Sequence, residues 1–169
     1  MWQVLRGAVP IMLAGNSYLL KPAPNVMGCA LLLQEILTAA GVPEGLFAVV
    51  KADNDGVAQA INDKRIAAVT VTGSVRAGGA IAALAGAAIK KCVLELGGSD
   101  AFIVLADADI DAAVKGAIAG RFMNNGQLCI SAKRIIVEAA VFEQFSEKFV
   151  SAVKAVSYTH LTLPTTERV

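Results

Sequence analysis

Residues 69–78 read VTVTGSVRAG and contain the junction that decides the fold. Residues 67–71 form a continuous apolar and β-branched run, which predicts a buried strand. The small-residue stretch after Ser74 predicts a helix that continues to about Leu84. A strand, a glycine-containing turn and a helix in direct succession are typical of α/β proteins with parallel sheets. We therefore expect an α/β fold.

The same alternation of strands and helices extends from this junction toward both ends of the chain. Before the junction we expect helix 2–13, strand 18–21, helix 25–40 with Asn25 as its N-cap, strand 47–50 and helix 57–61. After it we expect strands 92–96, 101–105 and 134–138, helices 110–122 and 142–155, and a loop at 124–128. Gly97 and Gly98 predict a domain boundary within this series.

The composition excludes several functional classes. The 169 residues include 15 Lys and Arg against 14 Asp and Glu, with the signs dispersed, so no basic patch for nucleic acid or an anionic membrane is expected. The longest uncharged run, residues 7–20, is broken by Pro10 and Gly15, whereas a membrane span needs about 20 mostly apolar residues. The first 20 residues lack a secretory signal pattern, which predicts a cytoplasmic protein. The hydrophobic content of 56% leads us to expect apolar faces that pack on parts of a larger protein.

Three cysteines are present, an odd number without a CxxC pair, which argues against a disulfide framework and against a structural zinc site. We interpret Cys29, on a helix, and Cys92, in a strand, as inert core residues. Cys129 ends the polar loop NNGQLC and is expected to be exposed. Backbone N–H groups in such a loop lower a thiol pKa and can hold an oxyanion, so Cys129 is a candidate nucleophile. An unreactive loop cysteine is the alternative.

Two further stretches carry candidate chemistry. The turn at Gly73 and Ser74 precedes a helix, whose N-terminus favours a phosphate or pyrophosphate, although a purely structural tight turn is the alternative. Glu95 is the only charge in the apolar run CVLELGG. Burying a lone carboxylate is costly, so it lies at a strand end facing a cleft or has a raised pKa. Both situations suit a general base, and an exposed sheet edge is the alternative.

Together these stretches resemble the aldehyde dehydrogenase superfamily. Its LELGG and GQxC patterns stand here at residues 94–98 and 126–129. Further similar stretches are LLKPAP at 19–24, GVPEG at 41–45, TGS at 72–74 and DADIDAAV at 107–114. The resemblance extends from Met1 to about Val156 and is strongest to bacterial NAD(P)-dependent succinate-semialdehyde dehydrogenases. It implies part of a Rossmann-like cofactor-binding domain at 1–96, the start of the catalytic domain at 97–156, and a homo-oligomeric parent protein.

The resemblance also implies individual roles. Cys129 would attack the aldehyde to form a thiohemiacetal, and Glu95 would activate the water that hydrolyses the later thioester. Contacts with NAD or NADP are implied for Lys21 at the adenosine ribose, Ser74 at the pyrophosphate, Gly73 and Gly78 around that turn, and Leu96 and Gly97 near the nicotinamide.

Some positions depart from the family pattern. Pro24 stands where many NAD-specific relatives carry an acidic residue, so NADP is not excluded. Residues 52–55 replace a glycine-rich turn, and Ser99 replaces the lysine of ELGGK, which removes a cation near the site. Arg121, eight positions before Cys129, is a candidate partner for a substrate carboxylate, with a solvated helix end as the alternative.

Two functions remain open at this point. The first is NAD(P)-dependent oxidation of an aldehyde, with succinate semialdehyde as the expected substrate. The second is an inactive nucleotide-binding fragment, because the family's oxyanion-holding Asn would precede Met1 and its downstream catalytic half would follow Val169. Transfer of the acyl group to coenzyme A is disfavoured by Glu95. Residues 157–169, SYTHLTLPTTERV, resemble nothing in the family, and we interpret them as an artefactual extension.

Overall fold

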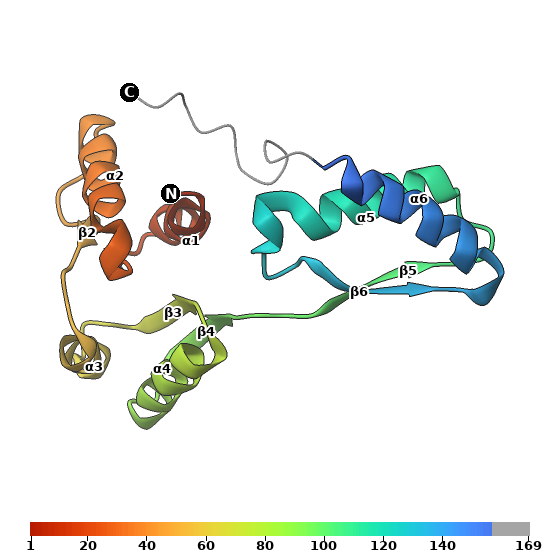
Figure 1. Cartoon of the computed structure of the whole chain (residues 1–169). Helices are drawn as coiled ribbons and strands as arrows, with labels where there is room; N and C mark the ends of the chain where they lie inside the picture. The colour runs from red at the N-terminus through yellow and green to blue at the C-terminus, as the bar shows by residue number, and fades with distance from the viewer. Residues whose placement is uncertain (157–169) are drawn as a thin grey trace. The chain divides into compact units, whose positions relative to one another are not determined.

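The computed structural model describes residues 1–156, so our interpretation of residues 157–169 lies outside this described part. The chain forms two compact units, which are described separately. The first unit consists of residues 1–72 and 76–95, and the second contains residues 73–75 and the described chain from Leu96 onward. Figure 1 shows the order of the helices and strands. The assignment of the chain to cofactor-binding and catalytic domains stays a prediction.

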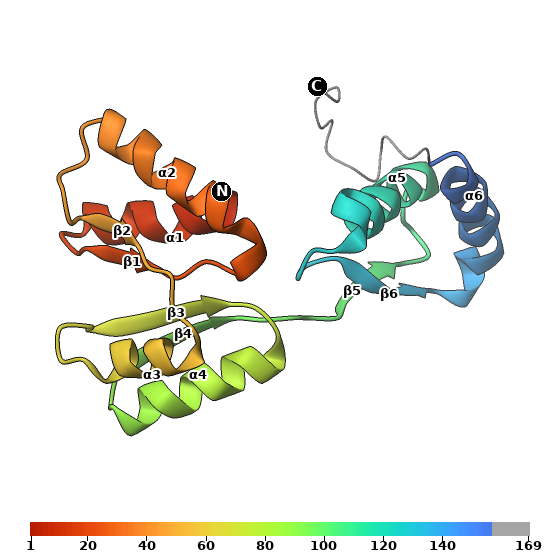
Figure 2. The same cartoon turned by 60° about the vertical axis from the view of Figure 1, so that its left-hand side comes forward.

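The N-terminal half of the first unit consists of two helices around a pair of parallel strands. Its elements are α1 (Trp2–Leu13), β1 (Tyr18–Leu20), the 3-10 helix η1 (Pro24–Val26), α2 (Met27–Ala39) and β2 (Phe47–Val49). Tyr18 lies opposite Phe47 in the β1–β2 register, and their rings stack with centroids 5.9 Å apart. Figure 2 shows α1 and α2 beside β1 and β2. A buried cluster joins both helices to both strands; its members are Ala8, Leu20, Ala30, Leu33 and Phe47.

The C-terminal half of the first unit contains the strand and most of the helix that flank the turn at residues 73–75. Its elements are α3 (Asn54–Asn62), β3 (Ala68–Thr72), α4 (Val75–Ala87) and β4 (Lys91–Glu95). β3 and β4 pair in parallel, with Thr72 opposite Glu95. Helix α3 begins three residues earlier than the expected start at 57, because the Asp53 carboxylate accepts a hydrogen bond from the Gly56 N–H at 2.9 Å and caps the helix.

The second unit packs two helices on a third pair of parallel strands. Its elements are β5 (Asp100–Val104), α5 (Ile110–Phe122), the 3-10 turn η2 (Met123–Gly126), β6 (Ala132–Val137), the 3-10 helix η3 (Ala139–Val141) and α6 (Phe142–Lys154). Val104, Val114 and Phe145 belong to its buried core. Lys148 Nζ of α6 lies 2.6 Å from the carboxylate of Asp111 on α5. These contacts hold the helices over the strand pair that flanks the Cys129 loop.

The α/β fold and the parallel pairing are confirmed. Within residues 1–156 the strands form three separate two-stranded sheets. Large apolar side chains are exposed, as expected from the composition; they include Trp2, Leu13, Ile103 and Leu105. None of the helices in residues 1–156 is long and apolar enough to cross a membrane.

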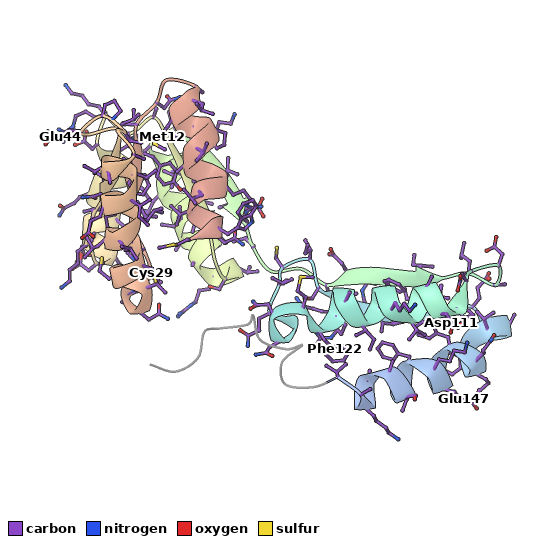
Figure 3. The ribbon with its side chains drawn as sticks, turned by 90° about the horizontal axis from the view of Figure 1, so that it is seen from above. Met12, Cys29, Glu44, Asp111, Phe122 and Glu147 are labelled. Atoms are coloured by element: carbon purple, nitrogen blue, oxygen red, sulfur yellow. The ribbon has the colours of Figure 1, made fainter. Side chains whose placement is uncertain are left out.

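Two predictions about helix α2 are wrong. Asn25 is not an N-cap, since it lies inside η1, and no side chain caps α2. Cys29, which we expected in the core, is exposed (Figure 3). The helix is apolar on most of its surface, but its buried residues are Ala30 and Leu33 only. Because nearly every face is apolar, periodicity could not indicate which one packs.

Candidate functional site

The loop before Cys129 has an unusual backbone. Asn124, Asn125 and Gly126 follow one another with φ angles of 53°, 58° and 69°. The left-handed region is open to glycine and is tolerated by asparagine better than by most residues, which explains the NNG sequence. The Gln127 N–H donates to the Asn124 carbonyl at 3.0 Å and closes the turn. Cys129 then follows as an exposed residue, as predicted.

Arg121 folds back onto this turn. Its Nη1 lies 3.5 Å from the Gly126 carbonyl oxygen, and its guanidinium lies 5.9 Å from the centroid of the Phe122 ring. A Cβ on Gly126 would lie 2.1 Å from that Nη1 and 2.8 Å from the Arg121 carbonyl oxygen. Glycine is therefore required at position 126 by both space and conformation. Arg121 is half-buried in the last turn of α5 and reaches the turn that follows it. Its role toward a substrate carboxylate stays a prediction.

The two motifs of the second unit meet at Gly98. A Cβ at this position would lie only 3.0 Å from the carbonyl oxygen of Cys129. The last glycine of LELGG thus allows the backbone to approach the cysteine segment closely. A Cβ at Gly97 would have no atom within 4 Å, so a larger residue has space at position 97 but not at position 98.

Two basic residues that the sequence analysis missed hold the same segment. Lys133 Nζ donates to the Gly98 carbonyl, and Arg134 Nε donates to the Ser99 carbonyl at 3.0 Å. Both residues belong to β6, which begins three residues after Cys129. The adjacent KR pair after the cysteine was visible in the sequence, but its partners lie 35 residues away along the chain.

Ser131 is the buried polar residue of this loop. Its side chain is fully buried, and its hydroxyl oxygen has no hydrogen-bond partner among the described residues. Its backbone N–H donates to the Leu128 carbonyl at 3.2 Å, which fixes the chain on either side of Cys129. Within residues 1–156, no backbone hydrogen bond uses the N–H of Cys129 itself. That donor is therefore available to a developing negative charge.

Glu95 is the last residue of β4 in the first unit, so the strand-end position is confirmed. Its side chain is 45% exposed, and its Oε2 lies 3.9 Å from Nη2 of Arg6 on α1. Such a long, half-exposed ion pair contributes little to stability. In the described chain β4 pairs with β3 alone, so Glu95 also stands on a strand with one open edge.

The residues expected to contact a nucleotide lie at strand ends. Lys21 is exposed directly after β1, and Gly73 and Ser74 are exposed between β3 and α4. Gly78 lies within α4 and is buried, so it differs from the other expected nucleotide contacts. Leu96 is half-buried and Gly97 exposed, directly after β4. Among residues 1–156, no group of three or more His, Cys, Asp or Glu is arranged to hold a metal ion.

A comparison with protein families matches residues 1–167 to the Aldehyde dehydrogenase family. The chain belongs to this family. The match continues beyond the end near Val156 that the motifs suggested. It accounts for the joint presence of the LELGG and GQxC patterns in one chain.

Within the aldehyde dehydrogenase family, the chain is similar to two curated bacterial proteins. It is 64% identical over 155 residues to succinate semialdehyde dehydrogenase (NAD(P)+) Sad of Escherichia coli K12, covering 92% of this chain and 34% of that protein. It is 47% identical over 167 residues to the succinate-semialdehyde dehydrogenase (NADP(+)) of Mycobacterium leprae, covering 99% of this chain and 36% of that protein. The chain thus spans about a third of the length of these family members.

Solved structures of the family show the same fold. Succinic semialdehyde dehydrogenase from Streptococcus pyogenes, in complex with NADP+, has a TM-score of 0.90 at 37% identity, covering 98% of this chain and 36% of that one. The protein Gox0499 has a TM-score of 0.89 at 51% identity, covering 92% of this chain and 34% of that one. The α/β fold of this chain therefore matches about a third of an aldehyde dehydrogenase structure.

Proposed function

We propose that this chain carries the nucleophile and the water-activating base of an NAD(P)-dependent aldehyde dehydrogenase. The substrate we propose is succinate semialdehyde, because both curated relatives are named for it. The observation that carries the proposal is the Cys129 loop: an exposed thiol follows a left-handed turn, and its own N–H is not used by a backbone hydrogen bond in residues 1–156.

Cys129 would attack the aldehyde carbon, and the resulting oxyanion would accept a hydrogen bond from the Cys129 N–H. The left-handed turn precedes the Leu128–Cys129 peptide that carries this N–H, and Gly98 approaches the following peptide at the Cys129 carbonyl. A donor held in place before the substrate arrives would stabilise the charge that develops in the transition state. Glu95 would take a proton from the water that hydrolyses the thioester on Cys129. Its half-exposed carboxylate is accessible to such a water.

NAD(P)+ would supply the hydride acceptor when bound. The exposed turn at Gly73 and Ser74 fits the pyrophosphate, since it stands directly before the N-terminus of the 13-residue helix α4. Lys21 would bind the adenosine ribose, and Leu96 and Gly97 would lie near the nicotinamide. Buried Gly78 would frame the turn from within α4.

We further propose that residues 1–96 belong to the cofactor-binding domain and 97–156 to the catalytic domain, in a cytoplasmic protein whose parent is a homo-oligomer. These assignments are supported by the family membership and by the passage of the chain into its second unit after Glu95. A nucleotide-binding role without turnover is the second candidate, since the chain spans only 34% of the Escherichia coli relative.

The test is the formation of reduced nicotinamide, followed by absorbance. The purified chain, at substrate-level concentration, is mixed with succinate semialdehyde and NAD+ or NADP+. A signal that disappears in Cys129→Ala supports the dehydrogenase. Binding of either nucleotide without any Cys129-dependent signal favours the second candidate.

A further inference from the structure

Backbone carbonyls beside Cys129 are held by charged side chains from the strand that follows it. Lys133 and Arg134 are neighbours in β6, and their donor atoms reach the carbonyls of Gly98 and Ser99, which are also neighbours. In an extended strand, consecutive side chains point to opposite faces. Lys133 and Arg134 nevertheless both reach the same two-residue segment, Gly98 and Ser99. The register shift between Asp100 and Ala101 lies directly beside that segment.

This arrangement has a conformational cost. Lys and Arg side chains both lose much rotamer freedom when they are fixed. Both carbonyls belong to exposed residues and could be hydrated instead. Hydrogen bonds from charged donors are stronger than those from neutral ones, which offsets part of the cost. The two hydrogen bonds hold the start of β6 and residues 98–99 in place relative to each other.

The segment held in this way is the one in contact with the nucleophile's backbone. The approach of Gly98 to the Cys129 carbonyl is close enough that a Cβ would stand 3.0 Å from the oxygen. Movement of residues 98–99 would change the packing on one side of the Cys129–Ile130 peptide. Arg121 acts on the other side of the cysteine, at the Gly126 carbonyl.

We propose that Lys133 and Arg134 are positioning residues, which clamp residues 98–99 onto the Cys129 carbonyl and so fix the orientation of the Cys129 peptide. The proposal rests on the proposed function only in taking Cys129 as the nucleophile. The clamp itself is a property of the second unit and requires no substrate.

The test labels the cysteines of the whole chain with 3-bromo-1,1,1-trifluoroacetone and records 19F NMR spectra. The Cys129 signal is assigned by its loss in Cys129→Ala, and the signal of exposed Cys29 is the internal reference. Amide hydrogen exchange of residues 97–101 is measured on the unlabelled chain. Neither readout depends on turnover, so failure of the dehydrogenase assay and failure of the clamp are distinguishable.

We expect K133M/R134M to broaden or split the Cys129 signal and to speed exchange of the Asp100 and Ala101 amides by roughly tenfold, since the start of the β5–β6 pairing then opens more readily. K133R/R134K, which keeps two charged donors, should restore the parent behaviour. Lys148→Met is the matched control, because it removes a lysine contact of the same unit far along the chain from Cys129. It should leave both readouts unchanged.

A parent-like Cys129 signal and parent-like exchange in K133M/R134M would overturn the proposal. So would a K133R/R134K variant that behaves like the methionine variant, since bulk and not hydrogen bonding would then matter. If the double variant does not fold by circular dichroism, Lys133→Met and Arg134→Met are measured singly. Each should show a partial effect, and two parent-like single variants would equally contradict the clamp.

Discussion

Cys129 and Glu95 differ in how the chain supports them. The Cys129 segment is held within its own unit by Arg121, Lys133 and Arg134. A Cβ would overlap other atoms at Gly126 and would be tightly packed at Gly98. Glu95 ends a strand, is 45% exposed and has one ion pair of 3.9 Å. The proposed nucleophile is thus organised locally, whereas the proposed base is held by fewer contacts.

The largest effect is expected at the turn before the cysteine. Gly126→Ala places a side chain at φ 69° and 2.8 Å from the Arg121 carbonyl oxygen, so we expect a loss of about 2–4 kcal/mol in the free energy of unfolding of the second unit. Denaturant unfolding of the chain measures it. Gly120→Ala is the control, because its Cβ meets only Ala132 at 3.8 Å. It should be neutral or stabilising, and equal effects of the two substitutions would contradict the account.

A smaller effect is expected where the two motifs meet. Gly98→Ala forces its Cβ against the Cys129 carbonyl, whereas Gly97→Ala enters open space. We expect the first to cost about 1–2 kcal/mol and the second less than about 0.5 kcal/mol. Thermal unfolding of both variants compares them directly. Equal melting temperatures would show that the Gly98 contact does not hold the cysteine segment.

These contacts mark the limit of what could be predicted from the sequence. The strand, turn and helix around Gly73 were predictable because hydrophobic runs and glycine act locally. The exposure of Cys29 was not, since an apolar helix gives no signal for the face that packs. The bonds of Lys133 and Arg134 were also missed, because side-chain contacts across 35 residues depend on strand pairing that periodicity does not fix.

Substitution of Ser131, unlike that of Gly126 or Gly98, is expected to raise stability. Removing a fully buried hydroxyl that has no partner in residues 1–156 should stabilise the second unit by about 1 kcal/mol. Ser131→Ala is compared with the parent chain by urea unfolding. Loss of stability would mean that the hydroxyl contributes a bond to the cysteine loop, and the local support of Cys129 would then extend to Ser131.

The smallest effect is expected in the acid stability of the second unit. The Lys148 ammonium holds the pKa of Asp111 below its ordinary 3.8, through a hydrogen bond and then through its charge. Because the folded-state pKa is lowered, this stabilisation is present above about pH 4 and is lost as the pH falls through the lowered value. In Lys148→Met, the free energy of unfolding should change less with pH below about pH 4 than in the parent chain. Urea unfolding at several pH values measures it. An unchanged acid profile would show that this exposed pair contributes nothing measurable.

The most direct test of the central claim is the mass of the cysteine peptides after the chain is incubated with succinate semialdehyde and NADP+. We predict an acyl group on the Cys129 peptide alone, in larger amount in Glu95→Gln, because hydrolysis of the thioester is then slowed. Cys29 is also exposed and is the internal control for nonspecific modification. An acyl group shared equally by Cys29 and Cys129, or one that does not increase in Glu95→Gln, would contradict the account.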